Sequence, residues 1–293
     1  MLKWERKAED MIIADKISDY KVLDTGDGMK LESWGGYLLA RPDPQVIWKK
    51  SRPALWEKAH AVYHRSATGG GHWEYRKQLP ERWEIGYGNL RFYVRPTGFK
   101  HTGLFPEQSA NWQFMMDALS GGEEVLNLFA YTGGATLAAA KAGARLTHVD
   151  AAKSMVAWAK ENAALSGLAD APIRYMVDDC MKFVLREQRR GRKYQGIIMD
   201  PPSYGRGSNG QIWRVEEHLF PLVEECAKLL AEDAKFFIIN SYTTGLSAVV
   251  TQNMLEQCVA EKRGGSIQAD SLVLPVQEQR IYLPCGTTAR WRA

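Results

Sequence analysis

The stretch EVLNLFAYTGGATLAAAKAGARLTHVD, residues 124–150, decides the fold. It starts with an apolar run of strand length, turns at Gly133 and Gly134, and continues as an alanine-rich helix over 134–142. A second apolar run then ends at Asp150. A strand, a helix and a strand in this order form the crossover unit of a parallel sheet. The stretch therefore predicts an α/β fold with a glycine turn and a carboxylate at neighbouring strand ends.

The same alternation continues through the C-terminal two thirds of the chain, after a helix predicted over 107–119. The predicted strands are 124–129, 145–149, 173–177, 194–199, 235–240, 271–275 and 280–284. The predicted helices between them are 134–142, 152–166, 181–190, about 212–230, and one more before the last two strands. This pattern predicts a parallel sheet with helices on both faces, which binds its ligand at the carboxyl ends of the strands.

The N-terminal third follows a different pattern, in which short extended runs are separated by glycine-rich turns. The runs are 19–24, 29–34, 37–41 and the two strands of a hairpin at 83–94. They predict a small, antiparallel, β-rich substrate-binding module over 1–104, followed by the α/β domain over 105–293. The stretch RSATGGGH, residues 65–72, is predicted to be a flexible loop.

The formal net charge of +4 is unevenly distributed. Residues 41–100 contain twelve Lys and Arg against five Asp and Glu, and ten aromatic residues, among them Trp48, Trp56, Trp73 and Trp83. Basic side chains beside exposed rings suit single-stranded or looped RNA. A small β domain with aromatic residues in its core and Lys and Arg in solvent has the same composition, so the sequence leaves both interpretations open.

Composition excludes several classes of protein. No stretch approaches the roughly 18 consecutive apolar residues of a membrane helix, and acidic residues stand near the N-terminus where a signal peptide would be apolar. The protein is therefore expected to be cytoplasmic. The four cysteines have no disulfide or zinc spacing, and His60 and His64 lack a third ligand, so no metal is expected.

The strand ends carry the residues that bind a ligand in such folds. The turn at Gly133 and Gly134 could present helix N–H groups to an anionic or carboxylate-bearing ligand, but the phosphate-binding patterns GxGxxG and GxxxxGK[ST] are absent. Asp150 could accept hydrogen bonds from a ribose diol or cap the next helix. Asp179, or else Asp178, could bind an adenine amino group or cap a helix. An adenosine without phosphates indicates S-adenosyl-L-methionine.

The stretch IIMDPPSY, residues 197–204, ends the fourth strand on a stiff loop. Asp200 and the carbonyl of Pro201 would form a fixed pair of acceptors for an amino or ring N–H group. Tyr204 would supply a face on which a flipped base stacks. Methyl transfer needs such an in-line nucleophile held within about 3 to 3.5 Å. The alternative is a plain rigid turn.

Taken together, LNLFAYTGGATLAAAKAGA, HVDAAKSMVAWAKENAALSGL, DDCMKF and DPPSY resemble the class I S-adenosylmethionine-dependent methyltransferases. They are most similar to the bacterial large-subunit rRNA methyltransferases that modify carbon 5 of cytosine, and to related ones that modify position 7 of guanine. The resemblance extends from about residue 98 to about 245. It implies a Rossmann-like seven-stranded methyltransferase sheet that ends in an antiparallel hairpin, with S-adenosyl-L-methionine as cofactor.

The resemblance also implies roles for single residues. The segment FKHTGLFPEQSANW, residues 99–112, is similar to a family segment that lies over the cofactor. The residues expected at the cofactor are Phe105, Gln108, Phe129, Tyr131, Thr132, Gly133, Gly134, Asp150, Asp179, Cys180 and Asp200. The residues expected at the substrate are Lys100, His101, Pro202, Ser203 and Tyr204. The expected catalytic group is Asp200, Pro201 and Tyr204.

Two departures from the family narrow the prediction. The carbon-5 enzymes need a nucleophilic Cys after the fifth strand, where this chain has NSYTT at 240–244, so carbon-5 chemistry is not expected. The N-terminal RNA-binding domain of those enzymes is not expected here, so RNA would be held by the basic aromatic module. DPPSY is similar to the Asn-Pro-Pro-Tyr of enzymes that methylate nitrogen.

These observations predict an enzyme that methylates a base nitrogen of RNA, with rRNA preferred. One alternative is a methyltransferase that acts on protein, DNA or a small molecule. The other is a non-catalytic methyltransferase-like protein that binds RNA or another partner. The sequence does not indicate an oligomeric state.

Overall fold

The computed structural model describes residues 11–66, 70–206 and 212–293, and contacts divide the chain into two compact units. Unit 1 consists of the chain up to Ile12, Asn111–Leu272 and Cys285–Ala293, and unit 2 of Ile13–Ala110 and Val273–Pro284. This division falls between residues 110 and 111, and it assigns residues 273–284 to unit 2. The domain boundary predicted between residues 104 and 105 stays a prediction. Part of the predicted flexible loop, 67–69, lies outside the described residues.

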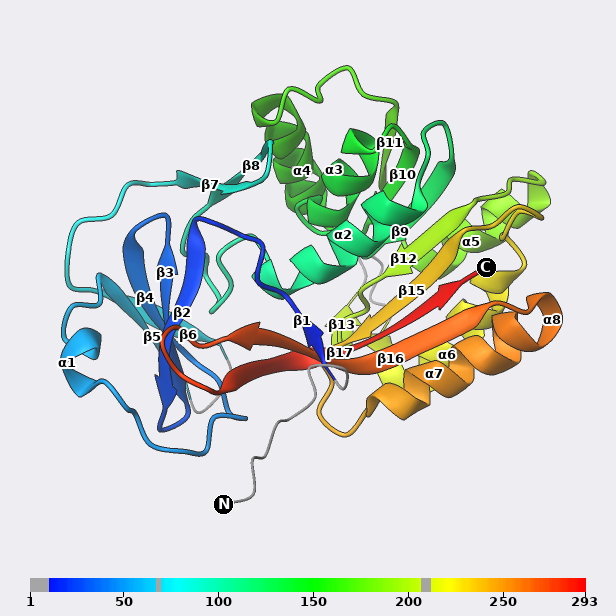
Figure 1. The fold of residues 1–293 in the computed structure, drawn as a ribbon. Helices are drawn as coiled ribbons and strands as arrows, with labels where there is room; N and C mark the ends of the chain where they lie inside the picture. Colours follow the sequence, from blue (N-terminus) through cyan, green and yellow to red (C-terminus); the bar gives the residue numbers. More distant parts are fainter. Residues whose placement is uncertain (1–10, 67–69, 207–211) are drawn as a thin grey trace. The chain divides into compact units, whose positions relative to one another are not determined.

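Unit 1 is built on a mixed sheet with the strand order β1-β16-β17-β15-β12-β9-β10-β11 (Figure 1). The strands are β1 (Ile12–Ile13), β9 (Glu124–Leu128), β10 (Arg145–Asp150), β11 (Ile173–Val177), β12 (Gly196–Met199), β15 (Phe236–Ser241), β16 (Ser266–Pro275) and β17 (Tyr282–Arg292). The five strands β9 to β12 and β15 pair in parallel, and β17 is antiparallel to β15. The predicted α/β class is therefore confirmed.

The sheet differs from the prediction at its ends. An eighth strand, β1, is only two residues long, too short to show a sequence pattern. β17 continues to Arg292, well beyond the predicted end at 284. The polar stretch TTARWR hides this extension, because Thr288 and Arg290 are buried although their residue types suggest solvent exposure.

Helices follow the parallel strands as predicted, within a few residues. They are α2 (Ser109–Ala118) after the 3-10 turn η2 (Pro106–Gln108), α3 (Gly134–Lys141), α4 (Lys153–Leu165), α5 (Cys180–Arg189), α6 (Val215–Ala227), α7 (Ala248–Leu255), the π-helical turn η3 (Glu256–Ala260) and α8 (Glu261–Arg263). The helix predicted from about 212 was wrong at its start. There, β14 (Ile212–Arg214) pairs with β13 (Tyr204–Arg206), because Ile212 and Trp213 favour a strand once a partner is present.

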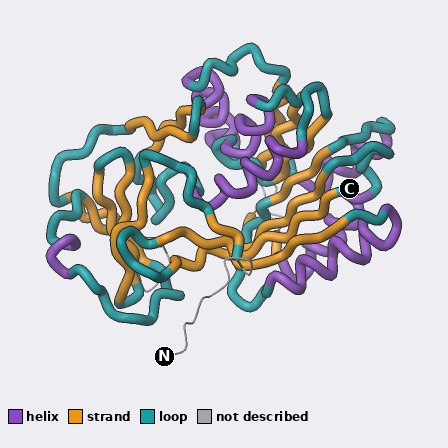
Figure 2. Tube along the Cα trace, in the orientation of Figure 1, coloured by secondary structure: helices purple, strands orange, loops and turns teal. Residues whose placement is uncertain are grey.

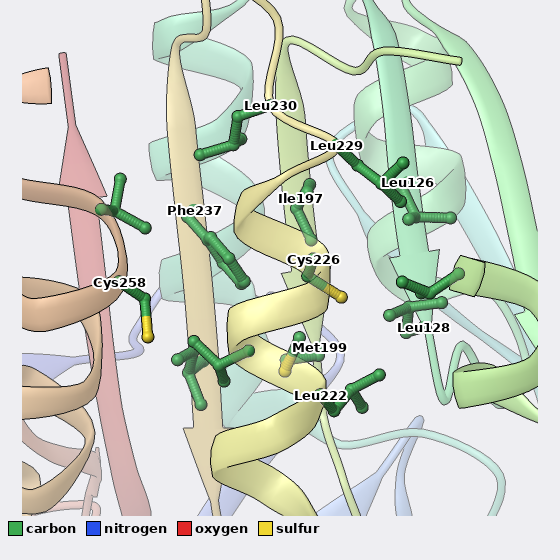
Figure 3. Close-up of a cluster of buried hydrophobic side chains, with 14 of the residues drawn as sticks. Leu126, Leu128, Ile197, Met199, Leu222, Cys226, Leu229, Leu230, Phe237 and Cys258 are labelled. Carbon is green, nitrogen blue, oxygen red and sulfur yellow. The ribbon is translucent and has the colours of Figure 1, made fainter. Parts of the chain in front are cut away.

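Helices of unit 1, purple in Figure 2, lie along its strands. The main core of unit 1 lies between the sheet and α5 and α6 (Figure 3). Side chains alternate along a strand, so every second residue faces these helices. The side chains that face α5 and α6 include Leu126 and Leu128 of β9, Ile197 and Met199 of β12, and Phe237 and Ile239 of β15. Each such burial stabilises the fold by about 1.5 to 3 kcal/mol. α3 and α4 pack against β10, and this packing aligns the strand ends.

No described helix is long and apolar enough to cross a membrane.

Unit 2 contains a five-stranded sheet and a separate hairpin. The sheet consists of β2 (Tyr20–Gly26), β3 (Met29–Trp34), β4 (Tyr37–Pro42), β5 (Ala61–Arg65) and β6 (Gly71–Tyr75), and the hairpin of β7 (Trp83–Tyr87) and β8 (Leu90–Val94). The predicted runs and the hairpin at 83–94 are confirmed. The sheet is not wholly antiparallel, since β4 and β5 pair in parallel through a long connection that contains α1 (Pro53–Trp56).

The aromatic residues of unit 2 belong mainly to its core. Of the four tryptophans noted in the sequence, Trp56 and Trp83 are buried, and Trp48 and Trp73 are half-buried. For these four rings, the composition therefore reflects aromatic residues in the core of a small β domain rather than rings exposed for RNA.

A buried ion pair lies in unit 2, with the Arg41 guanidinium carbon 5.2 Å from the centroid of the Trp34 ring. Arg41 donates from Nε and Nη2 to the two carboxylate oxygens of Glu32, both at 2.6 Å, and the Tyr20 hydroxyl donates to Glu32 Oε1 at 2.7 Å. Burial alone would raise the pKa of Glu32, but the charges of Arg41 and Lys30 and the hydrogen bonds lower this pKa to about 2. The carboxylate is therefore ionised and satisfied inside the core.

We expect Glu32→Gln to lower the free energy of unfolding of unit 2 by about 3 to 5 kcal/mol, because Arg41 would keep its buried charge without a counter-ion. Urea unfolding followed by tryptophan fluorescence measures the change. The matched control is Glu74→Gln, since Glu74 also pairs with an arginine, Arg76, but on the exposed surface. Equal losses for the two variants would contradict the importance of burial.

Candidate active site

The turn between β9 and α3 has an unusual backbone. Phe129 and Tyr131 have positive φ angles of 55° and 50°, and Gly133 has a φ of 88° at the N-terminus of α3. A Cβ added at Gly133 would lie 3.0 Å from Ala159 Cβ and 3.2 Å from Leu137 Cδ1, so α3 and α4 leave room only for glycine. Strained backbone in a short turn at a strand end is typical of a functional loop.

Buried polar side chains hold this turn in place. Asn162 of α4 donates from Nδ2 to the Thr132 carbonyl at 2.9 Å. Thr136 Oγ1, in the first turn of α3, accepts from Asn127 Nδ2 and lies 2.9 Å from His148 Nδ1. Burial lowers the pKa of His148 to about 3, so the imidazole is neutral and acts as a structural polar group.

Asp150 joins the glycine turn to the next helix. Its Oδ2 accepts the Tyr131 N–H and its Oδ1 accepts the Ala152 N–H, both at 2.8 Å. Burial raises the pKa of Asp150, and the two backbone hydrogen bonds offset part of that rise. The predicted role as N-cap was wrong, because the N-cap residue of α4 is Ala152 and no side chain caps this helix; Asp150 instead closes a turn of two residues before it. Each carboxylate oxygen has a second lone pair, so these contacts are compatible with the ribose role, which stays a prediction.

The third strand end, unlike the second, does show helix capping. Asp179 accepts the Lys182 N–H at 2.9 Å as the N-cap of α5, and Asp178 pairs with Arg186. Cys180 is buried behind Asp179 and forms a hydrogen bond with the Phe129 backbone. Burial raises the pKa of the Cys180 thiol. The contact of Cys180 with Phe129 brings the third strand end to the first.

The 200–204 loop begins at the end of β12 with Pro201 buried. The Asp200 N–H donates to the Leu128 carbonyl at 3.4 Å. Asn240, at the end of β15, donates from Nδ2 to the Met199 carbonyl at 3.5 Å. The start of the loop is thus held by a backbone carbonyl of β9 on one side and by the Asn240 side-chain amide of β15 on the other.

Two side chains that sequence reasoning missed hold the middle of the loop. The Trp213 indole N–H donates to the Pro202 carbonyl at 2.6 Å, and its ring lies 5.1 Å from the Phe129 ring, centroid to centroid. Ser203 Oγ lies 2.6 Å from Thr243 Oγ1. Trp213 was assigned to a helix, and Thr243 was noted only as a departure from a cysteine motif, so neither gave a usable signal.

The exposed part of the loop follows. Pro202 and Ser203 are exposed, and the Tyr204 side chain is 53% exposed at the start of β13.

The predicted site residues from the N-terminal third belong to unit 2. Arg41 donates from Nη1 to the Lys100 carbonyl at 2.9 Å, and the His101 ring lies 5.3 Å from the Phe105 ring. Burial, and then the charges of Arg41, Lys100 and Lys30, lower the pKa of His101 to about 3. Gln108 is buried in η2. The roles of these residues at the cofactor and the substrate stay predictions.

The unit 1 residues form one edge with a carboxylate, turn N–H groups and a stiff loop. Within residues 11–66, 70–206 and 212–293, no group of three or more His, Cys, Asp or Glu side chains is placed to hold a metal ion. The edge suits a ligand whose hydroxyl groups donate hydrogen bonds to the carboxylate.

Comparison with known proteins agrees with this arrangement. Residues 52–243 match the family model of the S-adenosylmethionine-dependent methyltransferases. The solved structure of a SAM-dependent methyltransferase from Agrobacterium tumefaciens is 34% identical, with a TM-score of 0.91, over 96% of this chain and 93% of that chain. The structure of SMU.776 complexed with SAH is 21% identical, with a TM-score of 0.72, over 95% and 76% of the two chains, and shares the fold.

Curated relatives match part of the chain. A ribosomal RNA large subunit methyltransferase K/L from Allochromatium vinosum is 30% identical over 70% of this chain and 26% of its own length. One from Syntrophotalea carbinolica is 36% identical over 48% of this chain and 19% of its own length. The chain thus spans about a quarter or less of the relatives it matches.

We expect Trp213→Phe to loosen the 200–204 loop, because it keeps a ring beside Phe129 but removes the donor to the Pro202 carbonyl. Loss of about 1 kcal/mol corresponds to roughly fivefold faster amide hydrogen exchange at Ser203 and Tyr204. Exchange mass spectrometry measures this rate. Trp158→Phe, on α4, is the control; unchanged exchange in Trp213→Phe would show that the indole N–H does not hold the loop.

Proposed function

The chain belongs to the S-adenosylmethionine-dependent methyltransferase family, and on that premise we propose that it methylates a ring or amino nitrogen of an RNA base, with ribosomal RNA as the target. The observation that carries the proposal is the 200–204 loop: a carboxylate and a carbonyl on a rigid backbone, beside an exposed tyrosine. The names of the curated relatives support RNA as the substrate class. An rRNA substrate would place the protein in the cytoplasm.

The unit 1 turn fits S-adenosylmethionine, which supplies a methyl group bonded to a cationic sulfur. We assign the methionine end to Tyr131, Thr132, Gly133 and Gly134, because these residues form the strained turn between the end of β9 and the N-terminus of α3. Asp150 would accept the ribose hydroxyls with its remaining lone pairs.

The adenine end of the proposed site would be formed by the β11–α5 turn. Asp179 and Cys180 would lie along the base, and Phe129 would contribute from the first strand end, to which the Cys180 hydrogen bond already joins it. Phe105 and Gln108 of unit 2 would complete the site.

The 200–204 loop would orient the acceptor. The Asp200 carboxylate and the Pro201 carbonyl would accept N–H hydrogen bonds from the base, which direct the nitrogen lone pair toward the methyl group. Forming the nitrogen–carbon bond would break the bond between that carbon and sulfur, whose electron pair stays on the sulfur, and the nitrogen would lose a proton to the carboxylate or to solvent. Pro202, Ser203 and Tyr204 would hold the base plane.

Nitrogen is favoured over carbon 5 because carbon 5 must first be activated by a thiolate. The 240–244 segment has no cysteine, and its Asn240 and Thr243 are engaged in supporting the loop. Burial raises the pKa of the thiols of Cys180, Cys226 and Cys258, which keeps them protonated and poorly nucleophilic. A base nitrogen needs no such activation.

We expect S-adenosylmethionine at about 100 times its Kd to raise the Tm of the wild type by roughly 5 to 10 °C. Asp150→Ala should abolish the shift, and Asp150→Asn, which keeps one oxygen for the turn, should reduce it. Differential scanning fluorimetry with and without the cofactor measures the shift. Asp117→Ala, an exposed aspartate on α2, should keep it in full. A normal shift in both Asp150 variants would exclude the ribose role.

We expect Asp200→Ala to bind S-adenosylmethionine with a Kd within about twofold of wild type and to lose at least about 100-fold in methyl transfer. Deuterated methyl donor, rRNA substrate and nucleoside mass spectrometry measure the transfer and identify the modified atom. Asp170→Ala, another exposed aspartate of unit 1, is the control. Appearance of 5-methylcytosine would refute the nitrogen assignment, and label found only in protein, DNA or a small molecule would refute RNA.

A further inference from the structure

Two aromatic side chains of unit 2 are not part of its core. Among the ten aromatic residues of 41–100, Tyr75 is 58% exposed and Phe99 is 65% exposed. Tyr75 ends β6, which is an edge strand of the five-stranded sheet. Large rings left in solvent by a unit that buries most of its others indicate a binding surface.

A tryptophan brings the two rings to the same region. The Trp73 indole N–H donates to the carbonyl of Thr97 at 2.9 Å and to that of Phe99 at 3.2 Å. Tyr75 follows Trp73 by two residues, so both side chains stand on the same face of β6. The loop that carries Phe99 therefore lies against the face of β6 that carries Tyr75.

This loop is a defined structure. The Phe99 N–H donates to Thr97 Oγ1 at 3.2 Å, and the Thr97 hydroxyl lies 2.8 Å from the His101 carbonyl. A fixed backbone under an exposed ring lowers the entropy lost when a ligand stacks on that ring.

Positive charge surrounds the end of the same loop. Lys100 follows Phe99, and its carbonyl accepts a hydrogen bond from Arg41. Burial, and the charges of Lys30, Arg41 and Arg65, lower the pKa of Lys100, while the carboxylate of Asp43 raises it. Lys30 and Arg41 are each paired with a carboxylate, Asp43 and Glu32. Arg65 pairs with Gly71 of β6, two residues before Trp73, and so stands on the same face of the sheet as Trp73 and Tyr75. Lys100 and Arg65 therefore supply the positive charge available to an anion.

The acidic residue of β6 does not cancel this charge. Glu74 points to the opposite face of the strand, where it pairs with Arg76 Nε at 2.8 Å and His64 Nε2 at 2.7 Å.

From this arrangement we propose that Tyr75, Phe99, Lys100 and Arg65, here called the β6 surface, bind single-stranded RNA. The two rings stack on bases, and the two cations contact phosphates. This inference rests on the proposed function for its substrate class and adds the residues that hold the strand. A protein partner would contact the rings, and its affinity would depend little on salt. Duplex DNA would contact the cations, and its affinity would not depend on the rings.

The test is fluorescence anisotropy of the full chain with a labelled single-stranded RNA of about 12 nucleotides, at about 50 and 200 mM salt. We expect Tyr75→Ala and Phe99→Ala each to raise the Kd roughly 5- to 100-fold. Tyr75→Phe keeps the ring and should stay within about threefold. Ile47→Ala, which removes an exposed apolar side chain without a ring, should leave the Kd unchanged.

Lys100→Ala should weaken binding and reduce the slope of log Kd against log salt by about one. The proposal is overturned if both ring variants bind the single-stranded RNA like the wild type. It is also overturned if duplex DNA of the same length binds as tightly as the single strand and the ring variants do not weaken that binding. Melting temperatures near wild type confirm that the variants are folded.

Methyl transfer from S-adenosylmethionine to rRNA by the wild-type chain is measured in parallel. If the wild type methylates rRNA but Tyr75→Ala and Phe99→Ala bind the RNA strand as tightly as the wild type, the β6 surface is refuted and the proposed function stands. No transfer to RNA, together with no binding of the strand, refutes the proposed function and the surface with it.

Discussion

The candidate site of unit 1 depends on the two hydrogen bonds that Asp150 accepts from backbone. A buried carboxylate is costly unless its oxygens are satisfied, and here one oxygen accepts the Tyr131 N–H and the other the Ala152 N–H. Tyr131 has a positive φ, a conformation that costs a non-glycine residue about 1 to 3 kcal/mol. The same two hydrogen bonds thus satisfy the buried carboxylate and hold the strained turn. They join the end of β9 to the start of α4 as one rigid piece.

The 200–204 loop is built onto that piece. Trp213 donates to the Pro202 carbonyl and lies against the ring of Phe129, which is the first strained residue of the turn. Thr243 supports the same loop at Ser203. The 240–244 segment therefore has a structural use in this chain. A loop supported in this way suits an acceptor that reacts without covalent activation, because orientation is the main requirement left to the protein.

The sequence predicted the features that follow from local pattern. Alternating apolar strands and helices revealed the parallel sheet, and the rule that ligands bind at strand ends selected Asp150 and the 200–204 loop before any contact was known. What it missed depends on partners distant in sequence. Trp213 becomes a strand residue only by pairing across to β13, and Arg290 is buried only because β17 continues beside β15. Likewise, composition could not separate the exposed ring of Phe99 from the buried rings of Trp56 and Trp83.

In unit 2, one arginine connects the core to the proposed RNA surface. Arg41 uses Nε and Nη2 for the buried Glu32 carboxylate and Nη1 for the Lys100 carbonyl. The guanidinium is planar, so the direction of the third bond follows from the first two. The ion pair therefore orients the backbone of Lys100 as well as stabilising the core. This dual use gives a physical reason to keep a buried pair that well-packed apolar residues could replace at little cost in stability.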